Sequence, residues 1–532
     1  MNSHNQLVKH LAHHLSETVC QTAEEPCEPN VQIIQTHISS VILAGPYAYK
    51  IKRNIKLPFL DFSTLDKRHK YCVKEVTLNQ RTAPEIYLDV VPITGSIENP
   101  EIQGDGPVIE WAVKMKRFAP GQLFSDLAQQ GMLTEQHATS FAHHIAEFHL
   151  AREPLDVNRL AHVKTTPHWF AESVHELKAL CKDDEQKQVQ LQALEEFNKR
   201  MAQTLRTQMP ERIAQGWYRE GHGDLHLANI TCTAKGIVAF DALEFDDDLR
   251  AIDLICEIAF PFMDLLAHGE HRLAWVFLNQ YLQLTGDYTG LAYLEYYVRY
   301  RALVRSKVSL LRIKQSNDSS SQERVKQQRL KQQFEAYWHL ACGPNITQTT
   351  PHLILVSGLS GSGKSTAAQE ICQQLGAVWL RADVERQRLF PDTDSKQRYH
   401  PDASDRTYAH LATLSQMLLK HGFHVIVDAT FLAQHQVDRF VESEHQTSHW
   451  QTHAVICKAP ENKLKNRIET RLEIGTDPSE ATVDVLTKQI KTQQDAPIQW
   501  PFETYELHND STLEALYHRI EKWLKTITTK TA

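Results

Sequence analysis

The segment that begins at Gly358 reads G-L-S-G-S-G-K-S, with the spacing G-x-x-x-x-G-K-[ST]. It follows the apolar run L-I-L-V-S and precedes a stretch with helical spacing, which is the context that this motif needs. Glycines let the backbone turn so that its N–H groups point at phosphate oxygens, and the helix N-terminus adds positive potential. We predict a nucleotide site in which Lys364 reaches the β- and γ-phosphates and the Ser365 hydroxyl binds Mg²⁺. The predicted nucleotide-binding residues are Gly358, Ser360, Gly361, Ser362, Gly363, Lys364, Ser365 and Thr366.

Charged residues follow this motif at positions that suit phosphoryl transfer. Asp383 and Arg386 stand at the end of the next apolar run, and Asp428 ends a later one, H-V-I-V-D. A carboxylate at a strand end can hold Mg²⁺ directly or through water. Arg467 and Arg471 are four residues apart, so they share a helix face and could clamp the transferred phosphoryl group. A solvated basic helix face is the alternative interpretation of this pair.

Together these features resemble the small P-loop kinases of the zeta-toxin, gluconate-kinase and polynucleotide-kinase type, over residues 352–525. The resemblance implies that Asp383 is the catalytic base for the substrate hydroxyl. It also implies that Arg386 and Arg439 contact the substrate and that the arginine pair belongs to a lid. No substrate pocket can be recognised, so the acceptor is left open.

A second set of candidate residues lies in H-G-D-L-H-L-A-N and, a little further on, F-D-A-L-E-F. The pattern resembles the catalytic and metal loops of aminoglycoside and choline phosphotransferases, which have the protein-kinase fold. It implies that Asp224 positions and deprotonates the acceptor hydroxyl, while Asn229 and Asp241 hold Mg²⁺. Asp253 resembles the structural acid that follows the metal loop in this family.

A kinase-like site also needs a strand lysine for the α- and β-phosphates and a helix glutamate that orients it. The run Y-A-Y-K-I-K-R places Lys50 and Lys52 on one strand face, and we favour Lys50 because it ends a V-A-I-K-like stretch. A helix predicted over 64–81 offers Glu75. The run W-A-V-K-M-K-R-F would form the hinge beneath adenine. No G-x-G-x-x-G precedes Lys50, so a kinase-fold domain without catalysis remains an alternative.

The elements that must position these residues change character along the chain. Leucines every four residues predict a helix over 5–19, and short β-rich runs then give way to largely helical sequence. The last third alternates strand and helix, which predicts a parallel sheet covered by helices. We therefore predict an N-terminal helical extension, a protein-kinase-like α+β domain of the aminoglycoside phosphotransferase type, a linker and an α/β P-loop domain. Their limits are 1–30, 31–345, 346–350 and 351–532.

Composition restricts the partners and the compartment. The 532 residues carry a net charge of −8, which weighs against a general electrostatic grip on nucleic acid. Nine scattered cysteines without a C-x-x-C pair suit a reducing cytosol. No apolar stretch approaches the roughly 18 residues needed to span a membrane. We expect a cytoplasmic protein without membrane partners.

The chain has only 20 glycines, so their clustering in the two proposed loops is informative.

The order of the two domains resembles bacterial proteins described as bifunctional aminoglycoside phosphotransferase/ATP-binding proteins. The leading hypothesis is an ATP- and Mg²⁺-dependent phosphotransferase with two nucleotide sites, which acts on a hydroxyl of an unidentified small molecule. One alternative is a polynucleotide-kinase-like end-processing enzyme, which would use the basic patch Lys458, Lys463, Lys465, Arg467 and Arg471. The other is an ATP-driven switch acting on an inactive kinase-fold domain.

Overall fold

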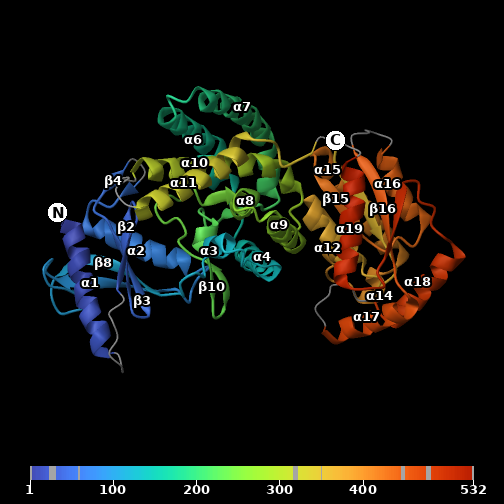
Figure 1. Ribbon diagram of the computed structural model, residues 1–532, viewed down its shortest axis with the longest axis horizontal. Coiled ribbons are helices and arrows are strands. Elements are labelled where there is room, and N and C mark those ends of the chain that lie inside the picture. The colour runs from blue at the N-terminus through green and yellow to red at the C-terminus, as the bar shows by residue number, and fades with distance from the viewer. Residues whose placement is uncertain are drawn as a thin grey trace. The chain divides into compact units, whose positions relative to one another are not determined.

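The computed structural model describes residues 3–22, 31–57, 60–315, 321–348, 350–444, 450–474 and 481–529 (Figure 1). The chain folds into two compact units, residues 1–264 and 265–532. This division falls inside helix α8 (Leu254–Ala267), so the domain limits that we predict from the sequence remain a prediction.

The first unit begins with helix α1 (Ser3–Thr22) and an antiparallel sheet in the order β1-β2-β3-β8-β6-β7. Successive side chains of a strand point to opposite faces, so one face of β3 packs against α1 and the other packs against α2. Tyr49 and Ile51 pack with Leu7, Leu11 and Leu15 of α1, which is the helix that the leucine spacing predicts. The strands are β1 (Gln32–Gln35), β2 (Ser39–Ala44), β3 (Tyr47–Lys52), β6 (Tyr87–Gly95), β7 (Pro100–Ile102) and β8 (Val108–Lys116).

Helix α2 (Leu65–Asn79) packs against β6 and β8 and lies in a core cluster with Ala48 of β3. Its start is fixed by Thr64, whose side chain accepts a hydrogen bond from the Lys67 N–H. Lys50 and Lys52 have the same strand parity as Ala48, so they point toward α2. A two-stranded pair, β4 (Lys56–Leu57) and β5 (Leu60–Asp61), precedes this helix.

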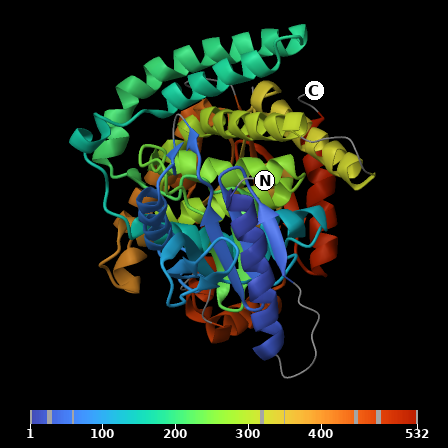
Figure 2. The same cartoon turned by 90° about the vertical axis from the view of Figure 1, so that its left-hand side faces the viewer.

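The remainder of the first unit is mainly helical, and α6 and α7 lie side by side (Figure 2). Two short antiparallel pairs, β9 with β12 and β10 with β11, bracket the two candidate loops. The elements are α3 (Phe124–Gln129), α4 (Glu135–Leu150), α5 (Val157–Leu160), α6 (Thr166–Leu180), α7 (Glu185–Ala214), β9 (Tyr218–Glu220), the 3-10 turn η1 (Leu227–Asn229), β10 (Ile230–Thr233), β11 (Gly236–Ala239) and β12 (Ala251–Asp253).

The second unit contains a five-stranded parallel sheet in the order β14-β15-β13-β16-β17, as the strand–helix alternation predicts. Helices α12 and α19 pack together and share one core cluster with the sheet. The strands are β13 (His352–Ser357), β14 (Ala377–Arg381), β15 (His424–Asp428), β16 (Gln451–Lys458) and β17 (Glu503–His508).

Helices precede and surround this sheet. Those before it are α9 (His271–Thr285), η2 (Thr289–Tyr293), α10 (Leu294–Gln315) and α11 (Ser321–Cys342). Those within the sheet region are α12 (Lys364–Leu375), α13 (Ala382–Leu389), α14 (Ser395–Arg398), α15 (Pro401–Lys420), α16 (Gln434–Glu444), α17 (Glu461–Ile474), α18 (Val483–Asp495) and α19 (Leu513–Thr528). Among the described residues, no helix is both long enough and apolar enough to cross a membrane.

Candidate active sites

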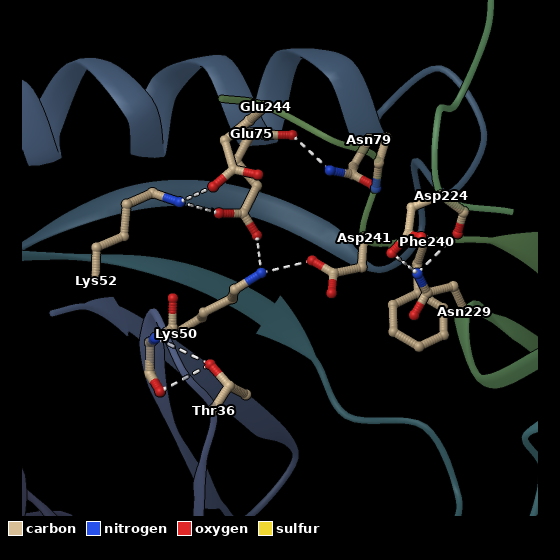
Figure 3. A network of polar contacts seen from close by, with 12 residues as sticks. Thr36, Lys50, Lys52, Glu75, Asn79, Asp224, Asn229, Phe240, Asp241 and Glu244 are labelled. Carbon is tan, nitrogen blue, oxygen red and sulfur yellow. Dashed lines mark hydrogen bonds and ion pairs between the residues drawn. The ribbon is translucent and has the colours of Figure 1, made fainter. Parts of the chain in front are cut away.

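In the first unit, the strand lysine, the helix glutamate and the metal-loop aspartate of the sequence prediction meet. The Lys50 Nζ lies 2.8 Å from the Glu75 Oε1 and 2.5 Å from the Asp241 Oδ1 (Figure 3). Burial works against the charge of Lys50, but the carboxylates of Asp241 and Glu75 outweigh it and raise its pKa well above the usual value. Burial alone would raise the pKa of Glu75, whereas the two lysines hold it at about 2.

A second lysine, Lys52, completes this cluster, and the sequence analysis assigns it no role. The Lys52 Nζ donates hydrogen bonds to the Glu75 Oε2 at 2.6 Å and the Glu244 Oε1 at 2.5 Å. All three side chains are buried. Sequence reasoning missed Glu244 altogether. The available signal was Lys52 itself, because a second lysine on a core-facing strand position requires buried carboxylates as partners.

The metal loop is held by groups from α2 and β6. The Asp241 N–H donates to the Tyr87 Oη at 3.1 Å, and the Ala242 N–H donates to the Asn79 Oδ1 at 2.8 Å. The Asn79 side chain in turn donates to the Glu75 carbonyl. Asp241 has a φ of 63°, a left-handed conformation that non-glycine residues seldom adopt. The surrounding contacts therefore fix a strained residue at the centre of the site.

The catalytic loop brings Asp224 and Asn229 together. The Asn229 Nδ2 donates to the Asp224 carbonyl at 2.9 Å and to its Oδ2 at 3.2 Å. The Asp224 side chain remains about one-third exposed, at 32%, so its carboxylate is accessible to solvent. His226 lies beside the same carboxylate, with its Nε2 3.5 Å from the Oδ2. The loop thus presents an accessible carboxylate next to an amide group, as the resemblance implies.

Two carboxylates of α8 and the His222 side chain hold the catalytic loop in place through hydrogen bonds. The Glu257 Oε1 accepts hydrogen bonds from the backbone N–H groups of His222 and Gly223, at 3.1 and 3.0 Å. The Asp264 Oδ2 accepts from the Leu227 N–H at 2.8 Å. The His222 Nε2 donates to the Phe240 carbonyl, which ties the catalytic loop to the metal loop. Burial lowers the pKa of His222 to about 4, so this ring is neutral at pH 7.

Asp253, the predicted structural acid, is buried and bound by one arginine. The Arg212 Nε and Nη2 donate to its two carboxylate oxygens at 2.6 and 2.7 Å. This bidentate pair joins α7 to β12.

A short turn joins β1 to β2, where protein kinases carry a glycine-rich loop. The Thr36 Oγ1 accepts a hydrogen bond from the Ser39 N–H at 2.9 Å, and the Ile38 carbonyl accepts one from the Arg53 N–H. Side-chain bonds of this kind stabilise a turn without glycine. Ala48 of β3 also belongs to a cluster of apolar side chains, which we call the apolar wall. Its other members are the buried Met115 and Val238 and the partly buried Phe118 and Phe240.

In the second unit, the G-x-x-x-x-G-K-S segment forms the predicted turn between β13 and α12. Gly361 and Gly363 have φ values of 80° and 82°. A Cβ on Gly361 would lie 2.5 Å from the Leu464 carbonyl oxygen, and one on Gly363 would lie 2.0 Å from the Asn509 Nδ2. Both positions therefore require glycine for conformation and for space. Lys364 is the first residue of α12.

Side chains of α17, of α18 and of the residue after β17 hold the backbone of this loop. The Ser360 N–H donates to the Gln489 Oε1 at 3.0 Å, and the Asn509 Nδ2 donates to the Ser362 carbonyl at 2.9 Å. The Arg467 Nη1 donates to the Gly361 carbonyl at 3.3 Å. Sequence reasoning missed Gln489 and Asn509, because no local pattern connects residues more than 100 positions apart with the loop that they support.

Asp428 ends β15 beside the phosphate loop, in register with Val356 of β13 and Arg381 of β14. Burial raises the pKa of its carboxyl group, although Lys364, Arg381 and the Ser365 hydroxyl act in the opposite direction. Lys364, Ser365 and Asp428, which the sequence predicts to bind phosphate and metal, thus interact electrostatically. The Arg381 Nε lies 3.9 Å from the Asp428 Oδ2.

The predicted base and one predicted substrate residue lie together on α13. The Arg386 Nη1 donates to the Asp383 Oδ1 at 2.8 Å, and the Tyr399 hydroxyl donates to the same oxygen at 3.2 Å. The Arg386 guanidinium carbon lies 4.5 Å from the centre of the Tyr399 ring. Sequence reasoning missed this tyrosine. Arg439 lies on α16, and within the described residues the structure shows no hydrogen bond between it and Asp383 or Arg386.

The arginine pair of α17 is half-buried and bound to backbone carbonyls. Arg467 donates to the Asn509 carbonyl at 3.1 Å as well as to Gly361, and the Arg471 Nη2 donates to the Ala481 carbonyl at 2.9 Å. The structure therefore places Arg467 at the phosphate loop and Arg471 beside Ala481, the first residue of the described segment that follows α17.

Comparison with known proteins bears on both units. A family described as "AAA domain" (AAA_33) matches residues 353–496. The chain is 27% identical over 428 residues to a Mycobacterium tuberculosis protein named Uncharacterized protein Rv2004c, covering 78% of this chain and 81% of that protein. It is 29% identical over 120 residues to the adenylate kinase isoenzyme 6 homolog of Caenorhabditis elegans, covering 22% of this chain and 58% of the homolog.

Among solved structures, choline kinase from Cryptosporidium parvum is 12% identical and has a TM-score of 0.38, with 62% of this chain and 94% of that chain covered. The predicted α+β and α/β classes are confirmed: the first unit has an antiparallel sheet with helices, and the second has a parallel sheet in the region that matches the AAA domain.

Proposed function

We propose that this protein is an ATP- and Mg²⁺-dependent phosphotransferase with two nucleotide sites, and that it transfers the γ-phosphoryl group to a hydroxyl of a small molecule. One observation carries the proposal. Lys50, Glu75 and Asp241, which are separated by up to 191 residues in sequence, form one ion-paired cluster. A domain that had lost catalysis would have no need to keep these charges together, since buried charges destabilise a fold unless they are fully paired.

In the first site, Lys50 would bind the α- and β-phosphates, Glu75 would orient it, and Asp224 would accept the proton of the acceptor hydroxyl. Asn229 and Asp241 fit a Mg²⁺ ion. The Asn229 Nδ2 is occupied by Asp224, so its Oδ1 is the atom left for a metal. The Asp241 side chain is 42% exposed. When bound, Mg²⁺ would neutralise charge that develops on the phosphoryl group. The apolar wall around Ala48 would receive the adenine.

In the second site, the phosphate loop would bind the β- and γ-phosphates through its backbone N–H groups and Lys364. Ser365 and Asp428 supply the hydroxyl and carboxylate oxygens that Mg²⁺ prefers. Asp383 would be the base, and its hydrogen bonds from Arg386 and Tyr399 would keep its carboxylate oriented toward the acceptor. Arg439, Arg467 and Arg471 keep their proposed roles as substrate and lid residues.

Two alternatives rank lower. A nucleic-acid end-processing enzyme requires a basic groove, yet the lysines of the C-terminal basic patch are engaged elsewhere. Lys458 pairs with Glu506, Lys465 pairs with Glu461, and Lys463 donates to the Asp510 carbonyl. An ATP switch with an inactive kinase-fold domain would not require an accessible Asp224 beside Asn229.

The proposal is tested by screening pools of small-molecule hydroxyl acceptors with γ-labelled ATP, using the full chain and its Asp224→Ala and Lys364→Ala variants. We expect each variant to lose a different part of the labelled products. If Asp224→Ala leaves every product unchanged, the first site is not an enzyme. If only oligonucleotide 5′-ends are labelled, the end-processing alternative replaces this proposal.

A further inference from the structure

The ion cluster of the first unit contains a half that no established role explains. Lys52, Glu75 and Glu244 are 0%, 0% and 3% exposed. They come from β3, α2 and the metal loop, so the triad connects the three elements that carry the nucleotide-binding charges. The Lys52 Nζ also lies 5.0 Å from the centre of the Phe62 ring, which closes it off further from water.

The other half of the cluster is open. Lys50 pairs with Asp241, and the side chains are 11% and 42% exposed. Both residues are the ones that phosphate and metal would engage, so their mutual ion pair must be exchanged when a nucleotide is present. The cluster contains two lysines and three carboxylates, a net charge of −1 that a cation can balance.

Glu75 joins the two halves through its separate oxygens. Its Oε1 faces Lys50 at 2.8 Å, whereas its Oε2 faces Lys52 at 2.6 Å. If Lys50 were its only partner, the Glu75 carboxylate would be free to rotate with it. The bond to Lys52 fixes the second oxygen, and Glu244 fixes Lys52 on its other side. Glu244 lies three residues after Asp241, so the same bond limits movement of the metal loop.

We infer that Lys52 and Glu244 are positioning residues of the first site: they hold Glu75 and the metal loop as one unit while Lys50 and Asp241 exchange partners (Figure 3). This inference rests on the proposed function for its catalytic consequence. Packing alone does not account for the triad, because well-packed apolar side chains stabilise a core as well as buried ion pairs do, or better.

The test uses the full chain with Lys364→Ala, so that turnover and nucleotide binding report on the first site. The variants are Glu244→Gln, Lys52→Met and the double variant, which leaves the net charge of the cluster at −1. We expect each to lower kcat by about 100-fold, because small misplacements of catalytic groups have effects of that size. The KM for the acceptor should change by less than about threefold, since neither residue contacts the acceptor.

The double variant separates positioning from charge balance. We expect its melting temperature to exceed that of either single variant, because no buried charge is left unpaired, while kcat stays low. Recovery of kcat together with the melting temperature would overturn the inference. Glu110→Gln is the matched control, since Glu110 is a buried carboxylate of the same sheet that pairs with Arg68 outside the cluster. It should lower stability and leave kcat unchanged.

Hydrogen exchange of the ligand-free chain provides a readout that does not depend on catalysis. The peptide over 240–245 contains the Asp241 and Ala242 amides, which are bonded to Tyr87 and Asn79. We expect faster exchange in Glu244→Gln than in the parent or in Glu110→Gln. Unchanged exchange would overturn the inference. Absence of turnover in the parent, with exchange changed as expected, would instead count against the proposed function alone.

Discussion

The two regions that we propose to bind phosphate are built in opposite ways. In the second unit, eight consecutive residues form the cradle, and most of its chemistry lies in backbone conformation and N–H groups. In the first unit, the corresponding charges come from β3, α2, the catalytic loop and the metal loop, and side-chain ion pairs bring them together. A contiguous site is specified locally, whereas a dispersed one depends on the whole fold around it.

Each site is therefore sensitive to a different kind of substitution. A backbone cradle fails when a Cβ is added, because there is no space for one at Gly361 or Gly363. An ion-pair cluster fails when one charge is removed, because its partner is then buried without compensation. Substitutions at the two sites should therefore have different consequences.

The largest effect is expected for the proposed bases, because general base catalysis contributes about 10²–10⁴-fold. Asp224→Asn should lower kcat of the first site by about 10³-fold without loss of nucleotide affinity. Asp383→Asn should do the same at the second site only. Turnover with labelled ATP is measured for each variant in the full chain. A loss of both activities from either single variant would show that the two regions are not independent.

Gly361→Ala should weaken nucleotide binding at the second site by about 100-fold, since the added Cβ meets a backbone oxygen that cannot move away easily. Equilibrium binding of a fluorescent nucleotide measures the change. Gly269→Ala is the matched control. Its φ of 81° is almost that of Gly361, and no atom lies within 4 Å of the added Cβ. The control should cost about 1 kcal/mol of stability and leave affinity intact, because only the backbone strain remains.

Acid should weaken both units through buried neutral histidines. Burial lowers the pKa of His222 to about 4 in the first unit, and of His352 and His424 to about 4 and about 3 in the second. Each folded pKa lies below the unfolded value of 6.5, so the unfolded chain binds more protons between the two values. The stabilisation is complete above pH 6.5 and is lost as the pH falls toward 4, by about 1.4 kcal/mol per pH unit for each histidine.

Urea unfolding at pH 7 and pH 5 measures this loss. His424→Asn should reduce the pH dependence of the second unit, because its side-chain oxygen can still accept the hydrogen bond that the His352 N–H donates to the imidazole. An unchanged pH dependence in this variant would mean that the pKa of His424 is the same in the folded and the unfolded chain.

The smallest effect is expected from helix caps. Thr64 caps α2, the helix that carries Glu75, and Thr512 caps α19 in the second unit. Replacing either by Ala should lower the free energy of unfolding by about 1 kcal/mol and leave kcat unchanged. Denaturant titration and turnover are compared for the pair. A lower kcat in Thr64→Ala alone would show that the start of α2 also positions Glu75.

The sequence predicts the contiguous features of this fold well. The leucine spacing of α1, the helix predicted over 64–81 and the order of strand, glycine turn and helix around Lys364 are local features, and the structure has each element where the sequence predicts it. The order of Lys50, Glu75 and Asp241 is readable only through resemblance to a family. The sequence analysis did not predict the ion pair between Lys52 and Glu244, nor the roles of Gln489, Asn509 and Tyr399. Their contacts arise from packing between segments that are distant in the sequence.

The seating of α1 has a practical consequence. Leu7, Leu11 and Leu15 are almost completely hidden where they meet Ile42, Tyr49 and Ile51 of the sheet. A recombinant protein that starts after this helix would expose a large hydrophobic surface of the sheet to solvent. Exposed hydrophobic surfaces of this kind promote aggregation. Removal of α1 should therefore make the recombinant protein insoluble, although every residue of both proposed sites would still be present.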